Sequence, residues 1–301
     1  MKNLRRIPVP GFAPEDVLFD AKGHIYTGLK ESNAIVRIDP SSDAAEVVAR
    51  PGGKPLGLEW LPDGRLLICN AELGLQTVDL ETGAVAPYPV KGVDIHLCNN
   101  AHVLADGTIL VSDSSSKFPL EEYPKDLIQN TCSGRLLRIT PDGNAEVLLE
   151  GLSFANGVVC LPSENTVLVA ATGTCQISRV DLATGQSTLF AEVDGHPDNM
   201  SIGSDGRIWV AVPSSKNNTL AQVHALPLIL RKLISNLPEF LQPKPQNCCW
   251  VHVFNPDGTL HKKFAGDPQM YFLVTGVREQ NGLVALGSIE QDAIAVFETD
   301  S

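Results

Sequence analysis

Residues 56–70 read LGLEWLPDGRLLICN, and this stretch contains the unit from which most of the chain is built. A short apolar run leads into the turn Pro62-Asp63-Gly64, and a second apolar run, Leu66 to Cys69, follows it. Asp-Gly between two apolar runs is a strong signal for two antiparallel strands joined by a tight turn. The stretch therefore predicts a β-hairpin.

The same unit recurs along the chain in six copies. Their turns are Asp20-Ala21-Lys22-Gly23, Pro62-Asp63-Gly64, Ala105-Asp106-Gly107, Ser163-Glu164-Asn165, Ser204-Asp205-Gly206 and Gln280-Asn281-Gly282. The last residues of these turns lie 41, 43, 58, 41 and 76 residues apart. The shorter intervals match the period of a four-stranded propeller blade, so the longer ones must contain insertions.

The two ends of the chain complete this pattern. The last repeat stops one strand short, soon after the apolar run Ala293 to Phe297, and Arg6 to Val9 precedes the first repeat as an unassigned strand. A strand from the N-terminus that completes the last blade would close the ring and remove its exposed edges. We therefore predict an all-β, six-bladed β-propeller closed by the N-terminal strand, as a single domain over residues 1–301.

Two insertions interrupt the repeats. Residues 112–133 are polar and predict a long loop, and long loops in compact domains are usually functional. The segment near 221–242 carries leucine and isoleucine at helical spacing and predicts a short helical insertion. A helical cap packed on the propeller is favoured over a helix lying on a membrane surface, because the insertion has few basic residues.

Composition and charge argue against some classes of function. The chain has 301 residues, with 23 Lys and Arg against 35 Asp and Glu, which gives a net charge of −12. This acidity argues against a nucleic-acid partner, whose backbone is bound by clustered Lys and Arg. The chain has no secretory signal pattern and no apolar run of about 18 residues, so we expect a cytoplasmic protein without a membrane span.

The cysteines agree with that expectation. There are seven, an odd number, without the paired spacing of a structural zinc site. Most lie in apolar strand-like runs, which predicts buried, reduced thiols.

Polar residues occupy matching places in the repeats. Counting eight residues back from the turn glycine gives Glu15, Leu56, Asn99 and Asp198 in repeats 1, 2, 3 and 5, and the corresponding places in repeats 4 and 6 hold Asn156 and Thr275. The innermost strands of a propeller line one axis, so these residues are expected to meet there. An Asn or Asp at one such place could be an ordinary turn former, but two carboxylates and two amides together favour a cation site.

The chemistry of these residues favours Ca²⁺. Two carboxylates that face each other repel unless a cation lies between them, and Ca²⁺ takes six to eight oxygen ligands in flexible geometry. No Cys or His lies at an equivalent position, which argues against zinc.

Several motifs resemble those of the strictosidine synthase-like proteins. They include Phe154-Ala155-Asn156-Gly157-Val158, Gly195-His196-Pro197-Asp198-Asn199 and Ser133-Gly134-Arg135-Leu136-Leu137. These proteins belong to the superfamily of the gluconolactonases, senescence marker protein and the paraoxonases, six-bladed propellers that hydrolyse lactones, aryl esters or organophosphates with an axial calcium. By this resemblance, Glu15, Asn99, Asn156 and Asp198 match calcium ligands, and Asn199 matches a further ligand of the paraoxonases.

The sequence departs from this superfamily at two places. Thr275 stands where the plant strictosidine synthases have their catalytic glutamate, which makes the alkaloid-forming condensation improbable. Leu56 stands where the paraoxonases have a catalytic histidine. The resemblance therefore implies a calcium-dependent hydrolase of lactones or esters with a different proton acceptor.

Two residues are candidates for that acceptor. Asp198 could accept the proton while it binds the metal, and the resemblance to the gluconolactonases gives its counterpart this role. His96 lies three residues before Asn99, and an imidazole is a common general base near neutral pH, although a loop histidine bonded to the backbone is the favoured interpretation of this residue. We favour Asp198.

The substrate is expected to be a small molecule. Leu56, Phe12, Phe118, Tyr123 and the helical insertion are candidates for an apolar wall, which favours a hydrophobic lactone or aryl ester over a sugar lactone. The alternative is a propeller that calcium stabilises and that binds a ligand or partner without turnover, since propellers also serve as binding platforms.

Overall fold

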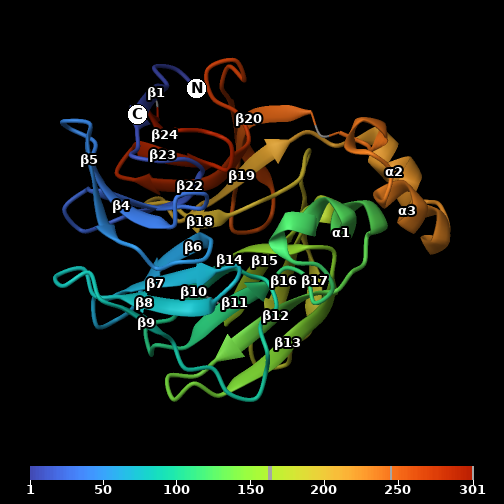
Figure 1. The fold of residues 1–301 in the computed structure, drawn as a ribbon, viewed down its shortest axis with the longest axis horizontal. Coiled ribbons are helices and arrows are strands. Elements are labelled where there is room, and N and C mark those ends of the chain that lie inside the picture. The colour runs from blue at the N-terminus through green and yellow to red at the C-terminus, as the bar shows by residue number, and fades with distance from the viewer. Residues whose placement is uncertain (162–164, 245, 300–301) are drawn as a thin grey trace.

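The computed structural model describes residues 1–161, 165–244 and 246–299 and contains six four-stranded antiparallel sheets arranged around one axis (Figure 1). The strands of blades 1 to 3 are β2 (Pro14–Phe19), β3 (Ile25–Leu29), β4 (Ala34–Asp39), β5 (Ala44–Ala49), β6 (Pro55–Trp60), β7 (Leu66–Asn70), β8 (Gly74–Val78), β9 (Val85–Pro87), β10 (Cys98–Val103), β11 (Ile109–Asp113), β12 (Gly134–Ile139) and β13 (Ala145–Leu152). Those of blades 4 to 6 are β14 (Ala155–Leu161), β15 (Thr166–Ala171), β16 (Gln176–Asp181), β17 (Ser187–Glu192), β18 (Met200–Ile202), β19 (Ile208–Ser214), β20 (Asn247–Phe254), β21 (Leu260–Ala265), β22 (Val274–Gln280), β23 (Leu283–Ser288), β24 (Ala293–Glu298) and β1 (Arg5–Pro8).

The predicted propeller and its closure are confirmed. Strand β1 pairs antiparallel with β24, with Ile7 opposite Ile294, and so completes blade 6. The turn that joins β6 to β7 has Gly64 at a φ of 85°, a conformation that glycine adopts without strain. The predicted turn of blade 4 lies partly outside the described residues, at positions 163 and 164.

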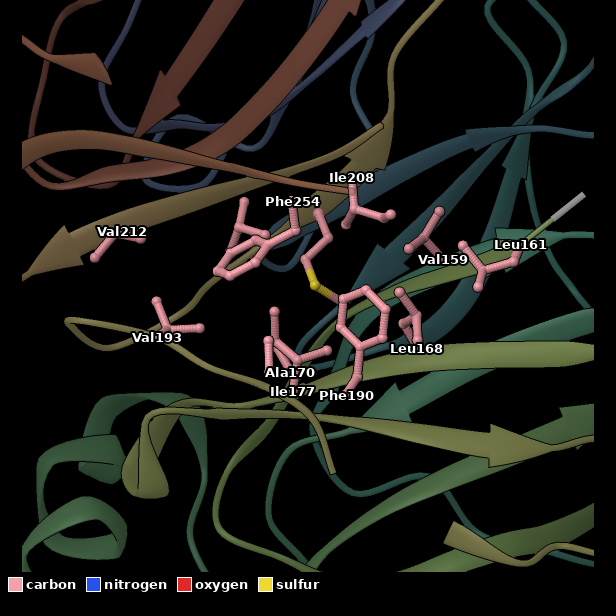
Figure 2. Packing of buried hydrophobic residues seen from close by; sticks show 13 residues of the cluster. Val159, Leu161, Leu168, Ala170, Ile177, Phe190, Val193, Ile208, Val212 and Phe254 are labelled. Carbon is pink, nitrogen blue, oxygen red and sulfur yellow. The ribbon is translucent and has the colours of Figure 1, made fainter. Parts of the chain in front are cut away.

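Apolar side chains between neighbouring blades form most of the core. Figure 2 shows one such cluster, in which Val159 and Phe190 of blade 4 face Ile208, Val212 and Phe254 of blade 5. Each strand contributes alternate side chains to the gap on either side of its blade. The blades are therefore held by apolar packing between sheets, and the innermost strands are left free to carry polar residues at the axis.

The prediction of a loop over residues 112–133 is wrong in part. This insertion contains η1 (Leu120–Glu122) and α1 (Tyr123–Gln129). Pro124 lies in the first turn of α1, where its fixed φ favours a helix, and Asn130 ends the helix in the left-handed conformation. The sequence pattern did not reveal this helix because two of its three buried residues, Asp126 and Gln129, are polar.

The helical insertion forms as predicted, but it packs on α1. It consists of α2 (Asn218–His224), α3 (Leu228–Ser235) and η3 (Glu239–Leu241), and one further turn, η2 (Thr172–Thr174), lies in blade 4. Leu220 and Val223 of α2 form a small core with Ile128 of α1, and His224 Nε2 lies 2.8 Å from the carbonyl oxygen of Leu127. The two insertions thus form one helical unit beside the propeller (Figure 1).

None of the helices in the described ranges is long and apolar enough to cross a membrane. All seven cysteines are free thiols, of which Cys132 alone is exposed.

Candidate functional site

The structure brings the matching positions of the six repeats together. The innermost strands β2, β6, β10, β14, β18 and β22 contact one another in a closed ring. One cavity of about 330 Å³ opens on this ring, and its lining includes the six residues found by counting along the repeats, namely Glu15, Leu56, Asn99, Asn156, Asp198 and Thr275. The predicted convergence on the axis is therefore present in the structure.

The residue after each of these positions explains how the strands approach so closely. Around the ring, polar side chains alternate with glycine, in the order Asp16, Gly57, Asn100, Gly157, Asn199 and Gly276. A Cβ at Gly57 would lie 2.8 Å from Asn100 Cα, so only glycine fits there. The sequence contained this alternation as a signal, and our sequence analysis missed it.

The polar members of this second ring join neighbouring blades. Asp16 Oδ2 accepts a hydrogen bond from the Leu58 amide at 3.1 Å, and Asn100 Oδ1 accepts one from the Val158 amide at 3.1 Å. Asn199 differs, because its Nδ2 donates to Glu15 Oε1 at 3.1 Å. Asn199 therefore turns toward the predicted ligands rather than toward the next blade.

A buried oxygen without a hydrogen-bond partner marks every predicted ligand. Within the described part of the chain, five such atoms lie at the axis: Glu15 Oε2, Asn99 Oδ1, Asn156 Oδ1, Asp198 Oδ1 and Asn199 Oδ1. Leaving one buried acceptor unpaired costs about 1–3 kcal/mol, so five together need an explanation.

The amide groups are held so that their oxygens remain available. Asn156 donates its Nδ2 to Thr172 Oγ1 at 3.3 Å, just as Asn199 donates its Nδ2 to Glu15. The oxygens of two carboxylates and three amides match the oxygen preference of Ca²⁺. Among the described residues no group of three or more His, Cys, Asp and Glu side chains could hold a metal, and the axial set has only two carboxylates.

The pKa shifts of the two carboxyl groups, Glu15 and Asp198, also favour a cation at the axis. Burial raises the pKa of Glu15 well above its usual range, and the charges of Asp198 and Asp16 raise it further. Burial also raises the pKa of Asp198 to about 7, although a hydrogen bond from Asn156 opposes this shift. A cation beside them would lower both pKa values and favour the charged carboxylates.

The guanidinium group of Arg278 pairs with Asp16 and Glu59 rather than with the axial carboxylates Glu15 and Asp198. Its Nη2 lies 3.4 Å from Glu59 Oε2 and 4.0 Å from Asp16 Oδ2, and its guanidinium also donates to the carbonyl oxygens of Val17 and Leu58. Arg278 therefore offsets the buried charge of Asp16, whose pKa is nevertheless raised by burial.

The two candidates for the proton acceptor occupy different places. Asp198 lines the axial cavity, whereas His96 is exposed and is absent from the described residues that line this cavity. The His96 amide donates to Asp113 Oδ1 at 3.2 Å, so the residue is positioned by its backbone. Its catalytic role stays a prediction.

A second cavity of about 170 Å³ adjoins the first and shares Asn156 and Asp198 with it. Its walls come mainly from apolar residues of α1, α2 and the propeller loops: Tyr123, Pro124, Leu127, Ile128, Phe154, Pro213, Leu220, Pro243, Leu273 and Ile289. Of the side chains predicted to form an apolar wall, Leu56 and Tyr123 line the cavities at the axis, Phe12 is exposed, and Phe118 lines a separate groove beside α3.

His196 also lines this side cavity, and our sequence analysis did not identify it. Its Nδ1 lies 2.8 Å from the Thr172 carbonyl oxygen, which makes Nδ1 the protonated nitrogen of the neutral ring. Burial lowers the pKa of His196. The sequence feature that could have identified His196 is its position in the motif 195–199, two residues before Asp198.

Comparison with known proteins agrees with the fold and the motifs. Residues 31–222 match the family model of the SMP-30/gluconolactonase/LRE-like region, and residues 1–37 match that of the strictosidine synthase-like N-terminal region. The adipocyte plasma membrane-associated protein of Rattus norvegicus is 30% identical over 266 residues, which cover 83% of this chain and 71% of that protein. Its counterpart in Salmo salar is 34% identical over 219 residues, which are 64% of this chain but only 52% of that protein.

Solved structures share the fold at low sequence identity. A gluconolactonase from Xanthomonas campestris superimposes with a TM-score of 0.71 at 16% identity, over 98% of this chain and 89% of the other. Regucalcin from Agrobacterium tumefaciens, described as a calcium-binding protein, gives 0.66 at 15% identity, over 97% and 92%. The family models, the relatives and the propeller together show that the chain belongs to the SMP-30/gluconolactonase/LRE-like family.

Proposed function

We propose that this chain is a calcium-dependent hydrolase of lactones or esters that carry an apolar substituent. The observation that carries the proposal is the set of five unpaired, buried oxygens around the axial cavity. A calcium ion bound there would polarise the substrate carbonyl and stabilise the oxyanion that forms when water attacks it. The gluconolactonase and regucalcin likenesses support both the reaction class and the metal.

The residues of this chain would carry out two tasks, metal binding and proton acceptance. Glu15 and Asp198 would supply the negative charge that holds the ion. The three asparagines would supply neutral oxygens, and those of Asn156 and Asn199 are oriented by the hydrogen bonds that their Nδ2 atoms donate. Asp198 is the proposed proton acceptor, because it borders both cavities. Burial raises the pKa of Asp198, so its side chain has a higher proton affinity than an exposed aspartate.

The two cavities suggest the shape of the substrate. Lys30, Glu31, Lys54 and Glu121 line the axial cavity and pair with one another, with Lys54 Nζ 3.2 Å from Glu121 Oε1. The side cavity is lined mainly by apolar groups and starts at Asp198 and Asn156. A carbonyl at the axis would therefore place an alkyl or aryl substituent in the side cavity.

A hydrolysis screen tests this proposal. γ- and δ-lactones of increasing alkyl length, aryl acetates and a fluorophosphate would be assayed with calcium and with EDTA. We expect turnover that needs calcium and rises with alkyl length. Calcium binding by calorimetry without turnover of any compound would instead favour the non-catalytic binding role.

Blocking the side cavity should change the preference for chain length. In Leu127→Trp the larger ring enters the cavity from α1, so kcat/KM should fall on the order of tenfold or more for long-chain lactones, because each buried methylene contributes about 0.8 kcal/mol. Short-chain lactones should be affected little. Leu189→Trp, at a side chain that is 56% exposed, is the matched control. An equal loss for all chain lengths would contradict the assignment.

The metal-free protein should lose stability as the pH rises. The folded pKa of Asp198, about 7, lies above the value of about 3.9 expected in the unfolded chain, so the folded state holds its proton more tightly. The stability that this proton provides at low pH is therefore lost between about pH 4 and pH 7. Denaturant unfolding in EDTA would measure this slope, and saturating calcium should remove it. A slope that calcium leaves unchanged would contradict the assignment.

A further inference from the structure

Helix α3 buries its polar side and exposes its apolar side. Ser235 is fully buried, and its Oγ accepts a hydrogen bond from Gln129 Nε2 of α1 at 2.9 Å. Arg231 is half-buried on the same side and donates to the backbone carbonyl oxygens of Gln129 and Asn130. A surface helix of a globular protein normally has the opposite arrangement.

The exposed side carries a stripe of large apolar residues. Ile229 is 70% exposed and Leu233 62%, and Leu237 continues the same spacing of four residues. In η3, Phe240 is 75% exposed. Among the described residues, thirteen large apolar side chains are exposed and seven of them lie within residues 228–241, so the exposure is concentrated in this segment. We call residues 228–241 the apolar strap.

The charge beside the apolar strap is opposite to that of the whole chain. A groove of about 480 Å³ between α3 and the 112–133 insertion has Lys117, Arg231 and Lys232 in its lining and no carboxylate among its described lining residues. The strap itself contains Arg231 and Lys232 but one acidic residue, Glu239, whereas the chain has a net charge of −12. Cationic groups beside an apolar stripe are typical of helices that lie on anionic membranes.

The small number of basic residues favoured a cap when the sequence was considered alone, but the structure turns the apolar stripe outward. We infer that the apolar strap docks on the surface of an anionic lipid bilayer. Its apolar side chains would enter the boundary between headgroups and acyl chains, while the exposed Lys232 faces lipid phosphates. Figure 1 shows α3 protruding at the margin of the molecule, where a flat surface could reach it.

Vesicle flotation tests this inference without using enzyme activity. The full chain would be mixed with vesicles of phosphatidylcholine alone and with vesicles that also contain phosphatidylserine. We expect binding to the anionic vesicles that weakens as salt is added. The double variant Ile229→Asp/Leu233→Asp should bind them on the order of a hundredfold less. Lys232→Ala should bind about fivefold less, since one lysine near the surface contributes about a factor of that size.

The controls separate docking from general effects of the substitutions. Leu189→Asp and Leu260→Asp alter side chains that are 56% and 47% exposed on outer strands, and both should leave vesicle binding unchanged. Thermal unfolding would confirm that each variant is folded. Absence of binding by the parent chain, or equal binding by the double variant, would overturn the inference. So would a dimer in size-exclusion chromatography that Leu233→Asp converts to a monomer, because a second copy would then cover the strap.

Discussion

Glu15→Gln and Asp198→Asn are each expected to weaken calcium binding on the order of a hundredfold and to reduce hydrolysis on the order of a thousandfold. Each change removes one of the two negative charges at the axis, and the charge of the ligands sets much of the affinity for Ca²⁺. Without the ion, the carbonyl would lose its main source of activation, an effect of the size seen when an oxyanion donor is removed. Calorimetry with calcium and initial rates at saturating calcium would measure the two effects.

Stability in EDTA distinguishes this result from misfolding. Both variants should be at least as stable as the parent without metal, because each removes one of two buried carboxylates whose pKa values burial raises. The parent alone should gain stability strongly when calcium is added.

His96→Ala is the matched comparison for the proton acceptor. Because His96 is exposed, this variant should keep both calcium affinity and kcat within a few fold. A loss of kcat on the order of a hundredfold with calcium binding intact would move the proton acceptor to His96.

Gly157→Ala should destabilise the propeller by about 3 kcal/mol or more and damage the calcium site with it. The added Cβ would lie 2.6 Å from the Asp198 carbonyl oxygen and 2.6 Å from the Met200 amide nitrogen, and both are backbone atoms that cannot rotate away. Overpacking of this kind forces backbone shifts, here in the strand next to Asp198. Denaturant unfolding at saturating calcium and calcium calorimetry would measure the two losses.

Gly23→Ala provides the control for this substitution. Gly23 has a φ of 87° but nothing within 4 Å of an added Cβ, so its replacement should cost only the strain of the turn, about 1–2 kcal/mol. Equal losses for the two variants would show that close approach of strands at the axis is not what Gly157 permits.

The repeat pattern made much of the site predictable. In a propeller, the distance of a residue from the turn of its repeat decides its height along the inner strand, so counting along the chain placed Glu15, Asn99, Asn156 and Asp198 on one axis. The same counting cannot tell what a side chain does after it arrives. Asn199 and Asn100 follow equivalent positions of their repeats, yet Asn100 accepts a hydrogen bond from the Val158 amide of the next blade while Asn199 donates to Glu15.

The helical insertion shows what the sequence alone determines and what only the tertiary structure decides. The sequence by itself determined six blades, closure by the N-terminal strand, the ring of axial oxygens and a helix with an apolar face, because each of these follows from local spacing. Only the tertiary structure decided which way that face points. Helix α3 packs its Ser235 side on Gln129, more than a hundred residues earlier in the chain, and this leaves Ile229 and Leu233 outward. Periodicity shows that a helix has two sides, but the partner that covers one of them is chosen by contacts between segments distant in sequence.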